Sequence, residues 1–325
     1  MPSVKPLLAL TVGDPSGIGP EITPLAVRAM RDEARVVVLG HGAVRPDWIP
    51  LVEEPSALGA AGAGWIETGG PPEWRLGEVQ RTCGEAALSA LRKGHDLASA
   101  GEVDALVTGP VNKAAMHAAG ELVEGQTELL SRWSGVERYE MMGLTGKLRV
   151  LLATRHVSLR EALDRITVDH VLDRLLFLRE ALCSIGLTDP LVALAGLNPH
   201  AGEGGLFGRE EIEILEPAVE RARAAGMRVQ GPLAPDSVFI RGLRGDFDAV
   251  LALYHDQAFI PLKLAGGSSG VTFVPGLPYR RFSPMHGTAF DIVGKRRADG
   301  QPVADPENLT EALRVASRIT RRTAD

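Results

Sequence analysis

Short apolar runs that stop abruptly at polar residues are the feature that most constrains how this chain can fold. Ala249–Leu253 follows an acidic turn and is followed, after one tyrosine, by His255, Asp256 and Gln257. An apolar run bounded by turn signals is typical of a strand buried in a parallel sheet. Open α/β sheets bind ligands just beyond the carboxyl ends of their strands. His255 is therefore a candidate site residue, and polar residues that follow other strands are candidates for the same reason.

Four further apolar runs have this character, and each gives way to glycine or polar residues before a helical pattern begins. They are Leu7–Val12, Val103–Val107, Leu148–Ala153 and Leu191–Leu197. The expected helices are Glu21–Arg31, Cys83–Ala100, Val157–Leu182, Glu210–Ala225 and Asn308–Arg321. Strands that alternate with helices predict an α/β fold with mainly parallel sheets and crossover helices.

The length of 325 residues predicts about two domains, at ~150 residues each. No Pro/Ser-rich linker separates two halves of the chain, so we expect the domains to be interleaved. Residues 1–120 and 285–325 would form the first α/β/α domain, and residues 121–284 would form the second.

The composition argues against several classes of protein. A net charge of −6 does not suit a nucleic-acid-binding surface, which is normally basic. No apolar run approaches the ~20 residues that cross a bilayer, and the short N-terminal run does not resemble a signal peptide. Cys83 and Cys183 are isolated and are expected to be buried thiols in a reducing cytoplasm. We therefore expect a cytoplasmic protein with a small-molecule partner and neither nucleic acid nor a membrane as partner.

Three of the predicted strand ends carry a histidine: His156, His200 and His255. A single histidine in such a place is more often a hydrogen-bonded structural residue, but three at one sheet edge favour a metal site. Neutral imidazole is the commonest metal ligand in proteins, and three imidazoles leave coordination positions open for a substrate. Zinc suits such a donor set best, cobalt is an alternative, and magnesium is possible but less expected.

Other residues near strand ends suit anions. Lys113 follows one strand, and Lys263 with Arg281 would suit a phosphate or carboxylate, although ordinary surface charge is an equally good interpretation. The glycine-rich residues 13–19 offer helix N–H groups but lack the GxGxxG spacing of a dinucleotide fingerprint. No Walker loop is present. Metal-assisted chemistry, or redox chemistry with a bound cofactor, therefore remains as the candidate type of reaction.

Seven motifs along the chain resemble a known family. GDPSGIGPE, TGPVNK, GQTE, LNPHAGEGGLFGREE, YHDQ, GLPYRR and HGTAFDI occur in the order seen in the 4-hydroxythreonine-4-phosphate dehydrogenases of vitamin B6 biosynthesis, the PdxA family. The resemblance covers essentially the whole chain. It implies the fold of isocitrate and isopropylmalate dehydrogenases, with two α/β/α domains and a cleft between them. It also implies a homodimer with a shared active site, the second domain carrying the metal ligands and the dimer interface.

The resemblance also implies roles for individual residues. HGTAFDI is similar to the adenine-binding loop of those dehydrogenases, so NAD or NADP would contact His286, Gly287, Thr288 and Asp291. The metal ligands would be His156, His200 and His255. The substrate-binding residues would be Gln126, Thr127, Lys263, Thr272 and Arg281. Asp236 matches an aspartate of the family, and Lys113 and Asp236 are the candidate general bases.

Three residues depart from the family pattern, since Gln126 replaces a histidine, Thr272 an asparagine and Met285 an aspartate. The departures lie around the substrate and cofactor, not around the metal. The first hypothesis is that the protein is a metal-dependent, NAD(P)-linked dehydrogenase in pyridoxal phosphate biosynthesis. It would oxidise 4-phosphohydroxy-L-threonine to a 3-keto acid that decarboxylates to 3-amino-2-oxopropyl phosphate.

Two alternatives stay open at this point. One is a paralogous dehydrogenase for another hydroxy acid, such as threonate or erythronate 4-phosphate, which the replacements at Gln126 and Thr272 favour. The other is a non-redox metal hydrolase or a binding protein. The missing GxGxxG fingerprint favours it and the HGTAFDI motif opposes it.

Overall fold

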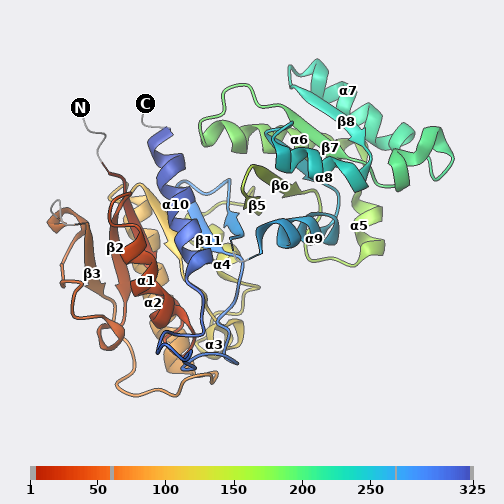
Figure 1. The fold of residues 1–325 in the computed structure, drawn as a ribbon. Coiled ribbons are helices and arrows are strands. Elements are labelled where there is room, and N and C mark those ends of the chain that lie inside the picture. Colours follow the sequence, from red (N-terminus) through yellow and green to blue (C-terminus); the bar gives the residue numbers. More distant parts are fainter. Residues whose placement is uncertain (1–4, 59–61, 268, 323–325) are drawn as a thin grey trace. The chain divides into compact units, whose positions relative to one another are not determined.

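The computed structural model describes residues 5–58, 62–267 and 269–322. The chain forms two compact units (Figure 1). Met1–Tyr139 and Val271–Asp325 make up the first, and Glu140–Gly270 makes up the second. The first unit is therefore made of two separate segments of the chain, and the second is one continuous segment.

The boundaries between the units differ from the expected ones at residues 120 and 284. Packing explains the first difference, because Leu129 and Leu130 join the buried core cluster that includes Leu91 and Leu106. Strand pairing explains the second difference. The strand that begins at Arg281 pairs with the strand that ends at Thr108 in the first unit.

The first unit is built on a mainly parallel sheet with the strand order β3-β2-β1-β4-β11-β10. Its strands are β1 (Leu7–Thr11), β2 (Arg35–Gly40), β3 (Ala63–Glu67), β4 (Ala105–Thr108), β10 (Val271–Phe273) and β11 (Arg281–Pro284). Only β10 runs antiparallel to its partner β11. All residues of β1 and β4 are buried, as the continuous apolar runs predict.

Helices of the first unit connect these strands. They are α1 (Gly19–Ala29), α2 (Arg81–Ser99), α3 (Lys113–Ala118), α4 (Gln126–Ser134) and α10 (Glu307–Arg322), with short 3₁₀ turns at Gly42–Val44 and Pro55–Ala57. The chain moves outward from β1 to β2 and back past β1 from β3 to β4. Right-handed crossovers therefore place α1 and α2 on opposite faces of the sheet. The α10 helix packs with α1, and α3 packs with α2.

The strands of the second unit follow the order β5-β6-β9-β7-β8. Its strands are β5 (Met142–Thr145), β6 (Leu148–Leu152), β7 (Val192–Ala195), β8 (Val229–Leu233) and β9 (Ala249–Ala252). β5 and β6 form an antiparallel hairpin, and the other pairs are parallel. Its helices are α5 (Leu159–Arg165), α6 (Val168–Ser184), α7 (Glu216–Ala224), α8 (Pro235–Arg244) and α9 (His255–Gly266). The segment Pro199–Gly205, which turns through left-handed backbone angles, and a π-helical segment at Glu211–Leu215 complete the second unit.

The predicted α/β class with mainly parallel sheets is confirmed, and each of the five predicted apolar runs contains a strand. Two details were wrong. The expected single helix over 157–182 is divided into α5 and α6, because α5 ends before Ile166 and Thr167 caps α6 by accepting from the N–H of His170. Cys183 is exposed near the end of α6, whereas Cys83 is buried as expected. None of the described helices is both long and apolar enough to cross a membrane.

Candidate functional site

Three neighbouring strands of the second unit each lead into a histidine. β6 and β7 flank β9 and run parallel to it, so the carboxyl ends of all three strands lie at one edge of the sheet. His156 follows β6, His200 follows β7, and His255 is the first residue of α9 after β9. The topology thus carries the three predicted ligands to the sheet edge where α/β proteins bind ligands.

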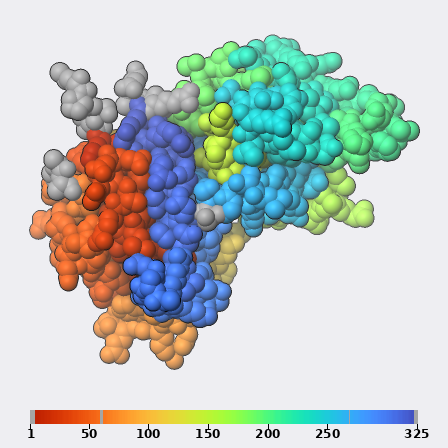
Figure 2. Space-filling view, in the orientation of Figure 1, coloured from red at the N-terminus to blue at the C-terminus, as the bar shows by residue number. Residues whose placement is uncertain are grey.

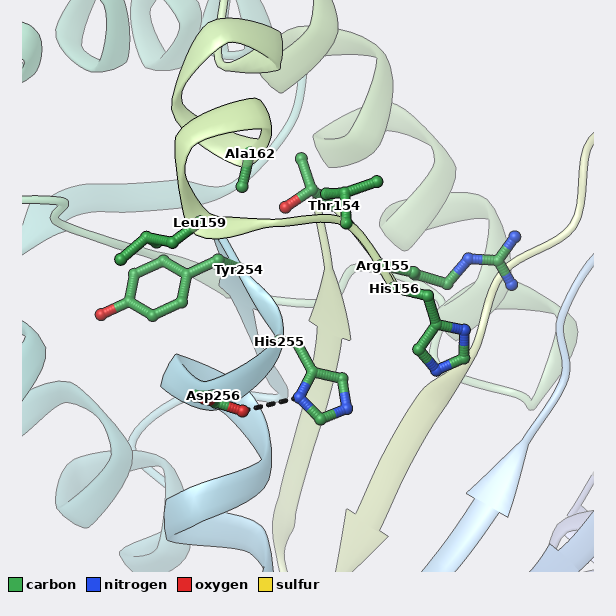
Figure 3. Close-up of a pocket in the computed structure, with 9 residues that line it drawn as sticks. Thr154, Arg155, His156, Leu159, Ala162, Tyr254, His255 and Asp256 are labelled. Atoms are coloured by element: carbon green, nitrogen blue, oxygen red, sulfur yellow. Dashed lines mark hydrogen bonds and ion pairs between the residues drawn. The ribbon is translucent and has the colours of Figure 1, made fainter.

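His156 and His255 face the same cavity (Figure 3). The centroids of the two rings lie 5.8 Å apart. The cavity has a volume of about 270 Å³ and a wall that includes Val157, Leu159 and Ala162. Nδ1 of His255 lies 2.7 Å from Oδ1 of Asp256. A carboxylate on one ring nitrogen fixes the tautomer and leaves the other nitrogen available to a metal.

His200 lies in a backbone segment of unusual conformation. Its φ is 54°, and φ of His156 is 38°, so both histidines adopt left-handed conformations that are rare outside glycine. Such outliers concentrate at functional sites, where the surrounding structure holds them in place. Nδ1 of His200 lies 3.9 Å from Oδ2 of Asp236, the predicted aspartate at the start of α8, and both side chains are largely exposed.

The donor chemistry of these loops suits a divalent metal such as zinc, because imidazole nitrogen and carboxylate oxygen are its usual ligands. Within the described part of the chain, however, no group of three or more His, Cys, Asp or Glu side chains is already arranged around one ion. The structure brings His156 and His255 together and places His200 beside Asp236.

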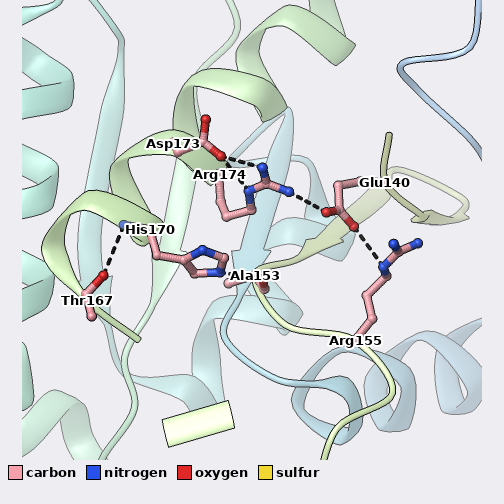
Figure 4. Close-up of polar contacts among 7 residues, drawn as sticks. All are labelled: Glu140, Ala153, Arg155, Thr167, His170, Asp173 and Arg174. Atoms are coloured by element: carbon pink, nitrogen blue, oxygen red, sulfur yellow. Dashed lines mark hydrogen bonds and ion pairs between the residues drawn. The ribbon is translucent and has the colours of Figure 1, made fainter. Parts of the chain in front are cut away.

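Polar contacts from α6 and from Glu140, just before β5, brace the loop that carries His156 (Figure 4). Nε2 of His170 donates to the carbonyl oxygen of Ala153 at 2.8 Å. Nε of Arg155 lies 3.1 Å from Oε2 of Glu140. Arg174 contacts the other carboxylate oxygen of Glu140. Glu140 is buried, and burial raises its pKa while the two arginines oppose the shift. The residues on either side of Thr154 are thus held by His170, Glu140 and Arg174, none of which was selected as a candidate from the sequence.

A second polar group lies in the first unit, around Arg281 on β11. The Arg281 side chain is fully enclosed, and the residue is 3% exposed. Nη2 donates to Oγ1 of Thr108 at 2.6 Å, and Nη1 donates to Oγ1 of Thr127 at 3.3 Å. Among the described carboxylates none forms an ion pair with Arg281, and its Nε has no partner. Burial lowers the pKa of Arg281 to about 10.

Burying the Arg281 guanidinium is costly, and the charge of Glu128 offsets only part of that cost, so the site favours a ligand that supplies negative charge. Thr272 belongs to the same face of the sheet as Arg281. It lies opposite Ser283 on β11, and Ser283 is two residues from Arg281. Thr272 is buried, and its hydroxyl adds a hydrogen-bonding group to the face of the sheet that carries Arg281.

Gln126 and Lys113 both follow β4 along the chain, and each begins a helix. Nε2 of Gln126 donates to the carbonyl of Gly109 at 3.0 Å, while its Oε1 is buried without a partner. Cε of Lys113 lies 3.8 Å from the point that a Cβ on Gly125 would occupy. Gly125 holds the cap position of α4, and the Thr127 hydroxyl accepts from Arg281.

The HGTAFDI loop packs on the glycine-rich loop of residues 13–19. The N–H of Ile18 donates to the carbonyl of Thr288 at 3.0 Å. A Cβ on Gly17 would lie 2.8 Å from the Cβ of Thr288, so the close approach requires glycine. Nδ1 of His286 bonds to the carbonyl of Gly287, and Asp291 is exposed. The structure therefore joins two motifs that lie far apart in the sequence.

Three residues of these sites were missed in the sequence: Thr108, Glu140 and Glu211. Thr108 directly precedes the Gly-Pro pair that ends β4, and that position was a usable signal. Glu211 is buried and bonds to the backbone at Leu197 and Asn198. A glutamate in a helical pattern is normally on the surface, so the pattern gave no sign of this role.

Comparisons with known proteins agree with the motifs. Residues 51–316 match the model of the family described as pyridoxal phosphate biosynthetic protein PdxA. The chain is 40% identical to a 4-hydroxythreonine-4-phosphate dehydrogenase of Desulfosudis oleivorans, over 96% of this chain and 95% of that protein. It is 39% identical to a D-threonate 4-phosphate dehydrogenase of Pectobacterium atrosepticum, over 96% of this chain and 99% of that protein.

A solved structure shares the arrangement of elements. The crystal structure of 4-hydroxythreonine-4-phosphate dehydrogenase from Klebsiella pneumoniae matches with a TM-score of 0.85 and 37% identity. The match covers 97% of this chain and 100% of the Klebsiella chain. These relatives are dehydrogenases, which opposes the hydrolase alternative.

Proposed function

This chain belongs to the PdxA family of dehydrogenases, and we propose that it oxidises the secondary alcohol of a four-carbon acid that carries a terminal phosphate, with NAD or NADP as hydride acceptor. The observation that carries the proposal is Arg281, a buried guanidinium without an ion-pair partner among the described residues. A planar guanidinium recognises phosphate and carboxylate through two parallel hydrogen bonds. Two threonine hydroxyls hold it in place.

His156, His200 and His255 would hold a divalent metal, with zinc the first choice and cobalt or magnesium as alternatives. A bound divalent ion lowers the pKa of a coordinated hydroxyl and polarises a carbonyl. Asp236 lies close enough to His200 to take up a proton there, and Lys113 is the second candidate for the base. Lys263, about two turns along α9 from His255, would supply a further cation for the phosphate.

The cofactor would lie on the HGTAFDI loop, where His286, Gly287, Thr288 and Asp291 would contact its adenine end. The hydride would leave the carbon that bears the oxidised hydroxyl. With 4-phosphohydroxy-L-threonine, the product is a 3-keto acid, which loses carbon dioxide to give 3-amino-2-oxopropyl phosphate. This reaction belongs to pyridoxal phosphate biosynthesis.

D-threonate 4-phosphate is the second candidate substrate, and Gln126 favours it. The two compounds differ at C2, which carries an ammonium in one and a hydroxyl in the other. The unpartnered Oε1 of Gln126 is a neutral acceptor, which suits a hydroxyl, whereas a buried ammonium gains more from a carboxylate. Threonate 4-phosphate is also the substrate named for the Pectobacterium relative.

A substrate panel decides between the candidates. The purified protein is given phosphorylated hydroxythreonine, threonate or erythronate, each with NAD and with NADP, and the reduced nucleotide is followed by absorbance. We expect turnover with at least one phosphorylated acid, and the Gln126→His variant should shift the preference among them. No turnover with any of them, together with no nucleotide binding in calorimetry, contradicts the proposed function.

Replacing His200 with alanine tests the metal part of the proposal. We expect turnover to fall about 10²-fold or more, because Lewis-acid catalysis supplies several kcal/mol. Chelation of the wild-type protein should cause a similar loss, which added zinc or cobalt reverses. His41→Gln, in the first unit, is the matched control. Near-full activity of His200→Ala, or activity that survives chelation, contradicts the assignment of His200 as a ligand.

A further inference from the structure

Glu211 is a buried carboxylate for which the proposed reaction has no use. The residue is 2% exposed and begins the π-helical segment Glu211–Leu215. Among the described cationic side chains none forms an ion pair with it. π-Helical turns often occur at functional sites. A buried carboxylate needs hydrogen bonds to offset its desolvation, and the identity of those partners shows what the side chain holds.

The partners of Glu211 lie immediately before His200. Its Oε1 accepts from the backbone N–H groups of Leu197 and Asn198, both at 2.8 Å. Its Oε2 accepts from Nδ2 of Asn198 at 2.8 Å. Charge-assisted bonds of this length are the stronger class of protein hydrogen bond. Glu211 thus fixes the direction in which the chain leaves β7.

The backbone that follows is a run of left-handed residues. The φ/ψ angles are 54°/28° at His200, 55°/45° at Ala201, 77°/−7° at Gly202, 44°/52° at Glu203 and 65°/24° at Gly204. L-residues avoid this region because the Cβ approaches the following carbonyl. Since three of the five are not glycine, the turn needs contacts that hold it in place.

Glu211 also contacts the middle of this left-handed turn. A Cβ on Gly202 would lie 2.7 Å from Oε2 of Glu211, so only glycine allows the approach. The same carboxylate therefore bonds to the backbone before His200 and packs against the backbone after it. His200 lies between the two points of contact.

We propose that Glu211 is a positioning residue, which holds His200 in the left-handed turn and so presents its imidazole for metal binding. The inference rests on the proposed function, in which His200 is a metal ligand. Groups that orient metal ligands without touching the metal typically contribute about 10–100-fold to metal affinity or activity. Glu211 acts on the backbone of the ligand, not on its ring.

The test compares four variants with the wild type: Glu211→Ala, Glu211→Gln, Gly202→Ala and Glu213→Gln. Glu213 lies on the same π-helical segment but is exposed and paired with Arg209, so Glu213→Gln is the matched control and should behave as wild type. Three quantities are measured. They are amide hydrogen exchange over residues 197–205 of the metal-free protein, zinc affinity by calorimetry, and the separate values of kcat and KM.

In Glu211→Ala we expect faster exchange at Leu197 and Asn198, zinc affinity lower by about 10–100-fold, and kcat reduced with little change in KM for the nucleotide. Glu211→Gln keeps one oxygen for the two N–H groups and should recover most of the loss. Gly202→Ala keeps the carboxylate but displaces the turn, so its zinc affinity should also fall. This variant provides the answer if Glu211→Ala does not fold.

Unchanged exchange over residues 197–205 and unchanged zinc affinity in Glu211→Ala overturn the positioning role. Wild-type zinc affinity in Gly202→Ala overturns it as well. A wild-type protein that binds no zinc contradicts the proposed metal site instead, and the exchange data then still show whether Glu211 holds the turn.

Discussion

At the scale of single residues, function and stability make opposite demands on Arg281. Its guanidinium is buried and has hydroxyl partners but no ion pair with a described carboxylate. A buried charge that is only partly compensated, here by Glu128, destabilises the free protein, and an apolar side chain of similar volume is often tolerated better. The arrangement makes sense if the missing negative charge arrives with the substrate.

Replacing Arg281 with methionine should therefore raise stability and abolish substrate use. We expect the free energy of unfolding to increase by about 1 kcal/mol or more, since removal of a buried charge relieves its desolvation. KM for the phosphorylated acid should rise beyond the measurable range. Urea unfolding and steady-state kinetics measure the two effects. Arg318→Met, on the exposed side of α10, is the control. A destabilised variant with normal KM contradicts this account of Arg281.

The sequence predicted residues whose role depends on chemistry alone and missed those whose role depends on burial. His156, His200 and His255 could be selected because imidazole at a strand end suits a metal. Glu211 could not, because its pattern is that of a surface helix, and only its hydrogen bonds to the start of the turn show its role. The left-handed run also could not be predicted, since Ala201 and Glu203 have no preference for that conformation.

At the scale of elements, apolar runs predicted the strands reliably. The reason is that these strands are almost wholly buried, as seen in β1, β4, β6, β7 and β9. Helix boundaries were harder. Thr167 interrupts a continuous helical pattern by capping α6, and a cap hydroxyl cannot be told from a helical threonine by periodicity. The pairing of β11 with β4 could not be predicted from the sequence either, because it joins segments that lie far apart in the chain.

The α2 helix carries a buried histidine that makes stability depend on pH. Nδ1 of His95 lies 2.9 Å from the hydroxyl of Tyr279, and the ring packs near Trp133. Burial lowers the pKa of His95 below its ordinary value of 6.5. The unfolded chain therefore binds a proton at a higher pH than the folded protein, and stability is lost as pH falls below about 6.5 toward the folded value.

The free energy of unfolding, measured in urea between about pH 7.5 and pH 5, should decrease with acid more steeply in the wild type than in His95→Gln. Glutamine cannot titrate in this range but can still hydrogen-bond to Tyr279. The comparison removes the contribution of all other groups, which the two proteins share. Equal slopes for the two proteins contradict the assignment to His95.

At the scale of the whole molecule, the second unit exposes apolar side chains on two neighbouring helices. Ile240 and Leu243 of α8 are 54% and 42% exposed, and Ile260 and Leu264 of α9 are 59% and 81% exposed. Figure 2 shows these segments, in cyan to light blue, at the surface of the unit. Apolar surface of this kind supports the predicted homodimer through the second unit.

Ile260→Glu tests this interface. A charge in the centre of an apolar contact should shift the protein from dimer to monomer in sedimentation experiments, because a buried unpaired charge costs several kcal/mol. If the active site is shared between subunits, turnover should fall in parallel with the dimer fraction. Ile260→Val is the matched control and should remain dimeric. A wild-type protein that sediments as a monomer contradicts the homodimer, and a dimeric Ile260→Glu places its interface elsewhere.

The two units also differ in when they can be completed during synthesis. Glu140–Gly270 is continuous in the chain, so the second unit, with the three proposed metal ligands, has left the ribosome while the first is still unfinished. β4 lacks a neighbour on one side until β11 is made. Domains generally fold as units while the chain emerges. The proposed metal ligands are therefore synthesised before Arg281, the proposed phosphate ligand, is added to the chain.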